Sequence, residues 1–540
     1  MKIALFAFAL FLSLTLSLQK AESQEYSYYE NNQFNPFTRN LYSSTNPYHT
    51  SVKNYSLNEV RGVLNSDSAV YRSFRIPSGK LNFWKRIFHE HLLMWDSQED
   101  NISVSIDPLF NWEVGKDKSS SLTKSTFINT RGLMVRGQIG KHVGFYCDVL
   151  ENQGSFPYYV QEEIEKIGVV PGQGRTKDRN LEEHDYSQST GYLSVDMDKY
   201  FNLQLGYGKN FIGDGYRSLL LSDNSYSYPY LKFTTTFWNV KYQIMWAQMN
   251  TFNPDSIAND DPMPKKWGVF HYLDWNIGKR FTIGLFENIT WANVDEKTGY
   301  RGFDFSYSTP LVLFRSAEYA NGSPDKVLVG LNSKLILWNR ATFYGQFVLN
   351  EFRFDELSSG NNWWANKYGF QAGFKQYNFL GAKNLDVQLE YNQIRPYTYS
   401  SDNGVSNYSH QNQPLAHPFG ANFKEIVAIG NYRYKRLFLQ GEIMLADWGA
   451  DSSDTLSYGK DVLKPNTLRV NDYGNVIGQG VATKTILLDG SISYLINPRN
   501  NFNIVLGLKS RSQTVNEIDA KNTFFYVGIR TSLKNHYYDF

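Results

Sequence analysis

The sequence predicts an all-β fold, a transmembrane up-and-down barrel of about 18 antiparallel strands with a small helical cap near the N-terminus. Apolar and polar residues alternate with a period of two through most of residues 101–540, which indicates strands with one apolar face. The connections between these segments alternate between short and long, as in outer-membrane barrels. Beyond the N-terminal segment, no run approaches the ~20 apolar residues that a spanning helix needs.

The pattern leaves the number of strands open. Boundaries read from alternation carry errors of several residues, so about 16 or about 20 strands also fit. An even number places both ends of the chain on the periplasmic side, next to the short turns. Basic residues gather in these turns, where they could meet anionic headgroups or simply be tolerated on a turn. They are Lys141, Lys199, Lys279, Arg280, Arg340, Lys435, Arg436 and Arg499.

The N-terminus is typical of an export signal. Lys2 supplies a positive charge, residues 3–18 form an apolar run, and residues 21–23 (Ala-Glu-Ser) fit the small-x-small cleavage pattern. A membrane anchor is the alternative, although the run is short for one. We therefore expect a signal peptide at 1–23, an N-terminal periplasmic region at 24–100 and an outer-membrane β-barrel at 101–540.

Residues 79–95 have helical periodicity. Five large apolar residues recur there at helical spacing: Leu81, Trp84, Phe88, Leu92 and Trp95. A single amphipathic helix cannot bury its apolar stripe alone, so it must pack against another surface. We expect it to cap or plug the periplasmic mouth of the barrel, with a position on the inner leaflet as the alternative. Residues 160–167 are a second, shorter helical candidate in a long loop.

Composition narrows the class of function. Lys and Arg number 54 against 52 Asp and Glu, which gives no support for nucleic-acid binding. The one cysteine, Cys147, cannot form an internal disulfide and is expected to fill a strand position. Aromatic residues make up 16% of the chain, which suits girdles at the membrane interfaces, although a large sugar-binding β protein can be equally rich in them. A terminal Phe540 is typical of outer-membrane barrels rather than of secreted cargo.

Residues 385–392 show the two faces of a predicted strand. Leu385, Val387, Leu389 and Tyr391 alternate with Asp386, Gln388, Glu390 and Asn392. In a membrane barrel the first set meets lipid and the second lines the lumen. The lumen wall is therefore expected to be polar and wet.

Several sequence stretches resemble a known family. LGYGKNFIGDGYRSLLLSDNSYSYPY at 205–230 is similar to a signature of the Wzi-like capsule-assembly barrels, in which a Gly-rich turn precedes an SL-LS-N run and a Pro-containing loop. Other stretches resemble a gliding-motility branch, the RemB-like proteins. They are LFENITWA at 285–292, YANGSPDKVLVGLN at 319–332, YGQFVLNEF at 344–352, NNWWANKYGFQAGFK at 361–375, LEYNQIRPYTYS at 389–400 and HQNQPLAHPFGANFKE at 410–425.

The resemblance, which covers residues 205–425, implies an outer-membrane barrel with a periplasmic helical cap. It also implies a role in binding or anchoring surface polysaccharide, in capsule assembly or gliding motility. We expect the protein to be non-enzymatic. The implied partners are outer-membrane lipid, surface polysaccharide, and gliding or surface-assembly proteins. This chain has FIGDG at 211–215 where the family has WGPG, which puts capsule binding in doubt. An outer-membrane porin or transport channel is the alternative function.

Residues in the predicted external loops are candidates for polysaccharide binding. Amides and imidazoles both donate and accept hydrogen bonds with sugar hydroxyls, and aromatic rings can stack on sugar faces. The candidates are Trp363, Trp364, Tyr397, Tyr399, His410, Gln413, His417 and Asn422. The alternative is a self-packed loop with an aromatic girdle.

Charged residues on the predicted strands are candidates for a network inside the lumen. They are Glu287, Glu351, Glu390 and Arg395. Pairing between opposite lumen walls would brace a wide barrel. Sugar contact and glycoside hydrolysis by two carboxylates are the alternatives, and the sequence does not give the carboxylate separation that hydrolysis requires.

The sequence predicts no catalytic residue, metal or cofactor. His89 and His91 are two apart on a predicted helix, so they point to different faces and cannot easily share a metal. Residues 209–214 (KNFIGD) lack the spacing of a phosphate-binding loop. A secreted glycan-degrading enzyme is a third reading, and the terminal Phe540 does not favour it.

Overall fold

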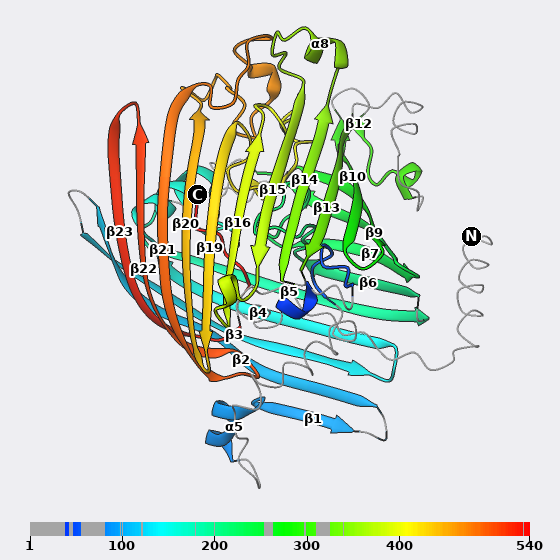
Figure 1. Cartoon of the computed structure of the whole chain (residues 1–540), viewed down its shortest axis with the longest axis vertical. Helices are drawn as coiled ribbons and strands as arrows, with labels where there is room; N and C mark the ends of the chain where they lie inside the picture. Colours follow the sequence, from blue (N-terminus) through cyan, green and yellow to red (C-terminus); the bar gives the residue numbers. More distant parts are fainter. Residues whose placement is uncertain are drawn as a thin grey trace.

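The computed structural model describes residues 38–42, 47–55, 82–97, 99, 101–119, 123–178, 180–198, 200–252, 263–295, 299–308, 325–338, 340–532 and 534–540. These residues fold into a closed antiparallel β-barrel of 18 long strands (Figure 1). The fold class and the preferred strand number predicted from the sequence are confirmed. The predicted signal peptide at 1–23 lies outside the described residues.

Each barrel strand pairs with its neighbours in chain order, and β23 returns to β2 to close the barrel, with Ile529 opposite Trp112. The barrel strands are β2 (Ile102–Ser119), β3 (Thr123–Ile139), β4 (Val143–Ser155), β5 (His184–Asp198), β6 (Phe201–Gly208), β7 (Tyr228–Phe237), β8 (Val240–Asn250), β9 (Lys265–Ile277), β10 (Phe281–Ala292), β13 (Lys326–Leu337), β14 (Ala341–Glu351), β15 (Lys367–Gln376), β16 (Leu385–Ile394), β19 (Phe423–Tyr434), β20 (Leu437–Ala450), β21 (Val481–Asn497), β22 (Phe502–Val515) and β23 (Ile518–Arg530).

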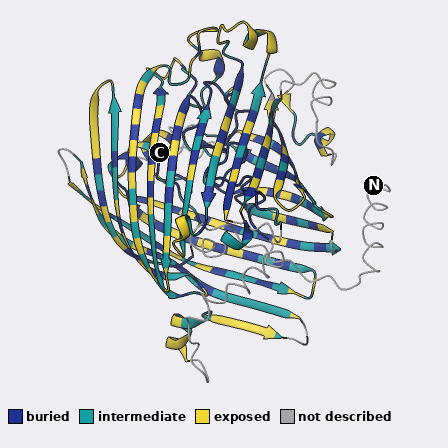
Figure 2. Ribbon diagram, in the orientation of Figure 1, coloured by how far each residue is buried: buried dark blue, intermediate teal, exposed yellow. Residues whose placement is uncertain are grey.

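The strands are apolar outside and polar inside, as the alternation predicts. On β16, Leu389 is 52% exposed while its neighbour Glu390 is 1% exposed and Asn392 is fully buried. Buried and exposed residues alternate along most strands in the same way (Figure 2). Cys147 occupies an exposed position on β4, so the expectation of a strand position is confirmed. The outer surface is therefore suited to hydrocarbon and the inner surface to water or polar chain.

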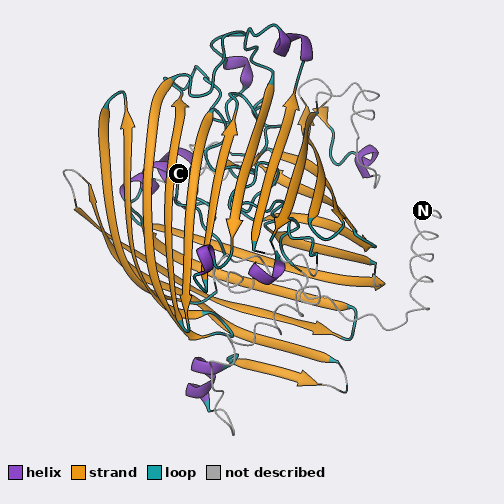
Figure 3. Cartoon of the chain, viewed as in Figure 1, coloured by secondary structure: helices purple, strands orange, loops and turns teal. Residues whose placement is uncertain are grey.

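The two ends of the barrel differ in their connections. The short-turn end carries tight turns such as 140–142, 278–280 and 435–436, whereas most connections at the long-loop end are many residues long (Figure 3). Two strand pairs are close in sequence at the long-loop end as well: β2 ends at Ser119 and β3 begins at Thr123, and residues 516–517 join β22 to β23. The connecting segments contain α6 (Tyr158–Ile167), α8 (Phe354–Ser358), the 3-10 turns η3 (Phe305–Ser308), η4 (Phe379–Gly381) and η5 (Asn466–Leu468), and the small strands β11 (Val294–Asp295), β12 (Gly299–Tyr300), β17 (Ser409–His410) and β18 (Gln413–Pro414). Helix α6 confirms the short helix predicted at 160–167.

The predicted helix at 79–95 is wrong in its second half. Helix α5 covers only Phe83–His89, and Leu93–Ser97 forms strand β1, which pairs with the first residues of β2. The side chains of α5 are not buried, so within the described residues this helix does not plug the lumen. His91 contacts Asp107 at 2.6 Å and Glu90 contacts Arg499 at 3.3 Å, so both pair with the barrel. None of the helices in the described ranges is long and apolar enough to cross a membrane.

Four chain segments fill the lumen instead. We call residues 47–55 the N-terminal insert, 209–227 the plug loop, 395–422 the cover loop and 534–540 the lumenal tail. The sequence predicted that both chain ends lie on the short-turn side. However, the tail turns back into the barrel, where Arg511 Nε of β22 donates to Phe540 O at 2.9 Å (Figure 1).

Candidate functional site

The plug loop is buried inside the barrel with both its apolar and its polar residues. Leu219, Leu220 and Leu221 are fully buried, and Ile212 forms isolated β-bridges with Leu221 and with Val52 of the N-terminal insert. Gly213 has φ 146°, a conformation that side-chain-bearing residues rarely adopt, so the chain can reverse here. The loop also buries the charged residues Lys209, Asp214, Arg217 and Asp223, so their burial depends on partners inside the barrel.

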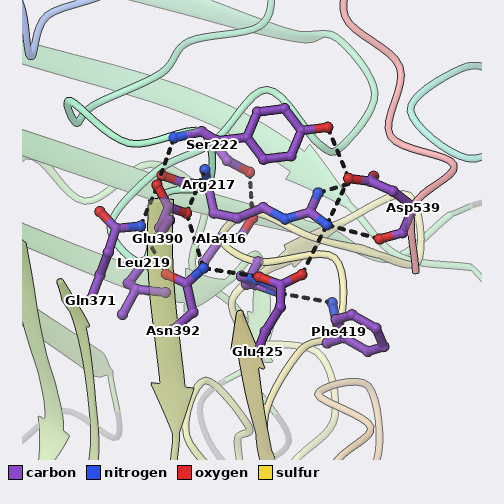
Figure 4. A network of polar contacts seen from close by, with 12 residues as sticks. Arg217, Leu219, Ser222, Gln371, Glu390, Asn392, Ala416, Phe419, Glu425 and Asp539 are labelled. Carbon is purple, nitrogen blue, oxygen red and sulfur yellow. Dashed lines mark hydrogen bonds and ion pairs between the residues drawn. The ribbon is translucent and has the colours of Figure 1, made fainter. Parts of the chain in front are cut away.

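Arg217 of the plug loop lies at the centre of a buried polar network (Figure 4). Its guanidinium donates to Glu425 Oε1 of β19 at 3.0 Å and to Asp539 Oδ1 of the lumenal tail at 3.2 Å. Glu390 of β16 accepts from the backbone N–H groups of Tyr216 at 2.7 Å and Arg217 at 3.0 Å. Wall, plug loop and tail are thereby joined through charged groups that are buried and paired.

The N-terminal insert adds a second buried cluster. His49 Nδ1 lies 2.7 Å from Asp274 of β9, and Thr50 Oγ1 donates to Asp214 of the plug loop at 2.5 Å. Burial alone would raise the pKa of Asp214, but the charges of Lys334 and Lys53 outweigh it and lower that pKa. Burial also lowers the pKa of Lys53 to about 7. The insert is therefore attached both to the barrel wall and to the plug loop.

The lumenal tail makes contacts along most of its length. Lys534 pairs with Asp148 of β4 at 2.8 Å, and Tyr537 donates to Asp223 of the plug loop at 2.8 Å. Tyr159 of α6 donates to Tyr538 O at 2.7 Å. The tail thus links the barrel wall, the plug loop and the helix at the long-loop end.

The cover loop holds the plug loop from the long-loop end. Tyr399 donates to Leu219 O at 2.7 Å and Tyr408 donates to Leu220 O at 2.5 Å. Both tyrosines are buried and their rings stack with centroids 5.6 Å apart. Tyr399, a candidate for sugar stacking, therefore packs against the plug loop in this structure.

The polar candidates of the cover loop are buried. His410 accepts from Asn250 N at 3.2 Å, and burial lowers its pKa to about 3. Gln413 accepts from Gly172 N at 2.6 Å, and His417 lies 2.7 Å from Glu425. Asn422 accepts from Gly478 N at 2.7 Å. These side chains fasten loops to one another, and a role in polysaccharide binding stays a prediction for them.

The two tryptophan candidates form a cluster with cations at the long-loop end. The charged groups of Lys367 and Arg469 lie 4.7 and 4.3 Å from the Trp364 ring centroid. The Trp363 ring lies 6.1 Å from the Trp364 ring, and the Tyr397 ring lies 6.0 Å from it. The structure therefore brings these three candidates together, although Tyr397 is 1% exposed.

The four residues of the predicted lumen network lie apart. Glu390 belongs to the Arg217 network, whereas Glu351 pairs with Lys367 at 3.0 Å near the long-loop end. Arg395 donates to Trp363 O and to Asn475 O, both at 3.3 Å. Glu287 is buried on β10. We expected charged groups on opposite walls of the lumen to pair directly. Glu390 instead contacts the plug loop, and the plug loop and the tail connect the walls.

A cavity of about 570 Å³ lies at the long-loop end, and we call it the basin. Helix α6, the cover loop and residues 448–464 form its walls, and Tyr537 and Phe540 of the tail lie at its base. Trp448 adds an aromatic surface, with Lys460 Nζ 4.4 Å from its ring centroid. Its charged lining residues are Glu162, Glu163, Lys166, Asp451, Asp454, Lys460, Asp461, Lys464 and Arg511. The basin therefore combines an aromatic ring with many donors and acceptors.

The charges around the basin interact with one another. Lys464 pairs with Asp451 at 3.1 Å. Burial, and next the charge of Lys166, lowers the pKa of Lys460 to about 8. Glu163 and other carboxylates raise the pKa of Lys166 above its usual value despite burial. Because both signs are present, the basin suits a polar ligand with many hydroxyls better than a strongly charged one.

A second cavity, of about 250 Å³, lies deeper in the lumen between the tail and the wall. It is lined by Glu113, Glu442 and Asp489 together with Lys509 and Arg530. Lys509 pairs with Asp489 at 3.0 Å. Within the described ranges, no group of three or more His, Cys, Asp or Glu is placed to hold a metal ion.

Sequence reasoning missed Arg217, Asp539 and the basin residue Trp448. A usable signal for Arg217 was the run RSLLLS at 217–222, because a loop so poor in charge is unlike an exposed one. The aromatic tail HYYDF at 536–540 gave a similar signal. No local pattern pointed to Trp448, since the basin is formed by loops distant in sequence.

Comparison with known proteins agrees with the fold. No family model and no curated protein matches the sequence. Among solved structures, the chain is similar to Wzi from Escherichia coli, an outer membrane protein involved in group 1 capsule assembly and a carbohydrate-binding β-barrel. The TM-score is 0.55 at 14% identity, over 95% of this chain and 100% of that chain. At this identity the likeness shows the fold alone.

Two other barrels are less similar. The outer membrane protein OprD from Pseudomonas aeruginosa has a TM-score of 0.43 at 11% identity, over 80% of this chain and 94% of that one. OccAB2 from Acinetobacter baumannii has a TM-score of 0.42 at 9% identity, over 79% of this chain and 97% of that one.

Proposed function

We propose that this protein is an outer-membrane barrel that binds surface polysaccharide in the basin and does not conduct solutes through its lumen. The long-loop end faces the cell exterior in this proposal, and the short-turn end faces the periplasm. The occupied lumen carries the proposal, because plug loop, cover loop, N-terminal insert and tail are joined there by buried pairs such as Arg217 with Asp539. A binding protein can function with a lumen that is filled by its own chain, whereas a channel needs a continuous pathway for solutes through the lumen.

The chemistry of the basin supports a glycan as the ligand. The Trp448 ring is fixed by a hydrogen bond from Nε1 to Thr485 Oγ1 at 3.1 Å, so it is held ready for an apolar sugar face. Charged groups that line the basin can exchange hydrogen bonds with sugar hydroxyls. Trp363 and Trp364, at the same end of the barrel, remain candidates for extending this surface.

The resemblance at 205–425 supplies the biological setting that we propose. Export by the segment at 1–23 would place the chain in the outer membrane, where it would take part in capsule assembly or surface gliding. Its partners there are lipid, surface polysaccharide, and gliding or surface-assembly proteins. Its proposed role is binding and anchoring, without catalysis.

Replacing Trp448 tests the basin directly. We expect Trp448→Ala to lower the affinity for surface polysaccharide by about tenfold, since a central aromatic contact is lost. The polysaccharide is purified from the cells that naturally make this protein. The measurement is calorimetry with the full chain in lipid nanodiscs. Trp238→Ala is the matched control, because Trp238 is 78% exposed on a turn at the opposite end. Equal binding by the wild type and Trp448→Ala would reject the basin as the site.

Transport is a second candidate, favoured by the cavity of about 250 Å³ inside the lumen. Planar-bilayer recordings separate the two functions. The filled lumen predicts little steady current, whereas a large and stable conductance from the intact wild-type chain would favour a porin.

A further inference from the structure

We propose that α5 and β1 form an interfacial anchor, which lies in the phospholipid leaflet at the short-turn end and completes the aromatic girdle of the barrel. This inference assumes the membrane setting given under Proposed function, but it does not depend on polysaccharide binding. It assigns a partner, the phospholipid interface, to a surface that the barrel itself leaves uncovered.

The anchor presents large apolar side chains that the described parts of the chain do not cover. On α5, Phe83 is 60% exposed, Trp84 66% and Phe88 41%; on β1, Leu93 is 56% and Trp95 64% exposed. Figure 2 shows helix and strand as largely exposed at the lower end of the molecule. Contiguous apolar surface of this kind is rare on water-facing parts of proteins and marks an interaction site.

The side chains of β1 continue the outward face of the barrel. In the β1–β2 pairing, Leu93 lies opposite Ile106 and Trp95 lies opposite Val104. Directly opposite residues share a face of the sheet, and even-numbered positions of β2, such as Val114 at 60% exposure, point outward. Leu93 and Trp95 therefore belong to the surface that meets hydrocarbon elsewhere on the barrel.

The anchor lies at the short-turn end where β23 no longer pairs with β2. Around the short-turn end, exposed aromatic residues near the strand ends include Tyr200, Phe237, Trp238, Trp338, Tyr434 and Tyr494. Such rings favour the membrane interface. At the seam, β23 ends at Arg530 opposite Asn111, whereas β2 extends further to Ile102. Strand β23 thus leaves the first residues of β2 without a partner on that side, and β1 pairs with them, which places Trp95 opposite Val104.

The attachment of α5 leaves its apolar face outward. Asn497 at the end of β21 donates from Nδ2 to the backbone oxygens of Ile87 at 2.8 Å and Glu90 at 2.9 Å. Arg499 pairs with Glu90 at 3.3 Å. These contacts use the backbone and the polar end of the helix, so its aromatic side chains remain available to lipid.

A fluorescent label on the anchor tests the proposal. In a Cys147→Ser background, Phe88→Cys carries an environment-sensitive dye in nanodiscs of phosphatidylethanolamine and phosphatidylglycerol, which leave both faces open to aqueous iodide. We expect the label to be protected from iodide and quenched by phospholipid with a nitroxide high on its acyl chain. Phe354→Cys is the matched control, since Phe354 is 70% exposed on α8 at the other end and should be quenched by iodide.

Two results would overturn the anchor. Iodide quenching at position 88 as strong as at 354 would mean that the helix lies in water. Protection from both iodide and the lipid nitroxide would mean that it packs on protein. Leu93→Cys provides a second labelling position if Phe88→Cys does not fold, as judged by heat-dependent migration on gels. Intact polysaccharide binding alongside either result would leave the proposed function standing.

Discussion

Arg217 joins three parts of the molecule that are distant in sequence. Its two nearest carboxylates, on Glu425 and Asp539, are both buried, and the guanidinium is a cation that pairs with both of them. A buried pair of this kind adds little net stability over an apolar replacement, but removal of one partner is costly because the other charge is left unpaired. Arg217 therefore determines whether the plug loop and the tail stay in place.

We predict that Arg217→Ala weakens the attachment of the lumenal tail by about 3–5 kcal/mol. Amide hydrogen exchange of residues 534–540, followed by mass spectrometry, should become much faster. Arg469→Ala is the control, because its partner Asp472 is largely solvent-exposed and surface pairs contribute about 0–1 kcal/mol. Unchanged exchange in the tail of Arg217→Ala would contradict the central place given to this residue.

The individual residues also show the limit of sequence reasoning at this scale. Glu390 was recognised as a lumen residue because strand alternation gives its direction. Its partners are backbone amides of the plug loop, and no pattern within β16 predicts them. His417 and Asn422 have the hydrogen-bonding chemistry of sugar ligands, yet the same chemistry serves equally well to fasten loops together.

At the scale of elements, the barrel strands show a recurrent packing of glycine against tyrosine. Inward-facing Gly373 lies against the ring of Tyr344 on the neighbouring strand, and Gly507 lies against Tyr526 in the same way. The absent side chain leaves space for the ring, which in turn covers the exposed backbone. In such pairs the tyrosine ring lies flat against the inner surface of the barrel, so it takes up little of the lumen.

We predict that Gly373→Ala destabilises the barrel by about 1–3 kcal/mol, since the new methyl group would overlap the Tyr344 ring. Displacement of the ring would also break the 2.8 Å hydrogen bond from Tyr344 to Glu390. Thermal denaturation followed on gels measures the loss. Gly430→Ala, where nothing lies within 4 Å of the added atom, should leave the midpoint unchanged. Equal midpoints for both variants would disprove the packing argument.

The elements were predictable to the extent that one periodicity governs them. Strand faces, turn positions and α6 follow from local patterns. The structure of segment 79–95 was not predictable in this way. Leu92 and Trp95 fit the apolar stripe of a helix as well as a strand, and a short apolar run does not distinguish helix from strand. The pairing of β1 with the lower part of β2 decided the outcome, and it depends on where β23 ends, a fact of tertiary structure.

At the scale of the whole molecule, the positions of the long loops do not follow from the sequence. Loop length shows at which end a connection lies, but not whether it folds over the barrel or into it. The basin and the network around Arg217 both result from inward folding, so they could not be predicted. Only the low charge of residues 217–222 and the aromatic tail indicated burial.

Acid should loosen the lumen filling. Burial lowers the pKa of His410 to about 3 and also lowers the pKa values of His417 and His536. When the loops and the tail are released, these histidines regain a pKa of about 6.5. At a pH below about 6.5 the released state therefore binds more protons than the packed state, and the free energy of unfolding of the lumen filling falls as the pH drops. We expect a lower thermal midpoint at pH 4.5 than at pH 7.5, with a smaller difference in His410→Asn. A higher midpoint at pH 4.5 would contradict this sign.

The seam between β2 and β23 has a consequence for assembly. Strand β3 pairs with β2 from Ile102 to Lys118, whereas β23 pairs with it only from Asn111 to Ser119. These partners are also the most widely separated along the polypeptide, so bringing them together costs the most chain entropy and should occur late. The tail follows β23, so its docking inside the barrel comes after this closure and helps to hold β23 in the closed barrel.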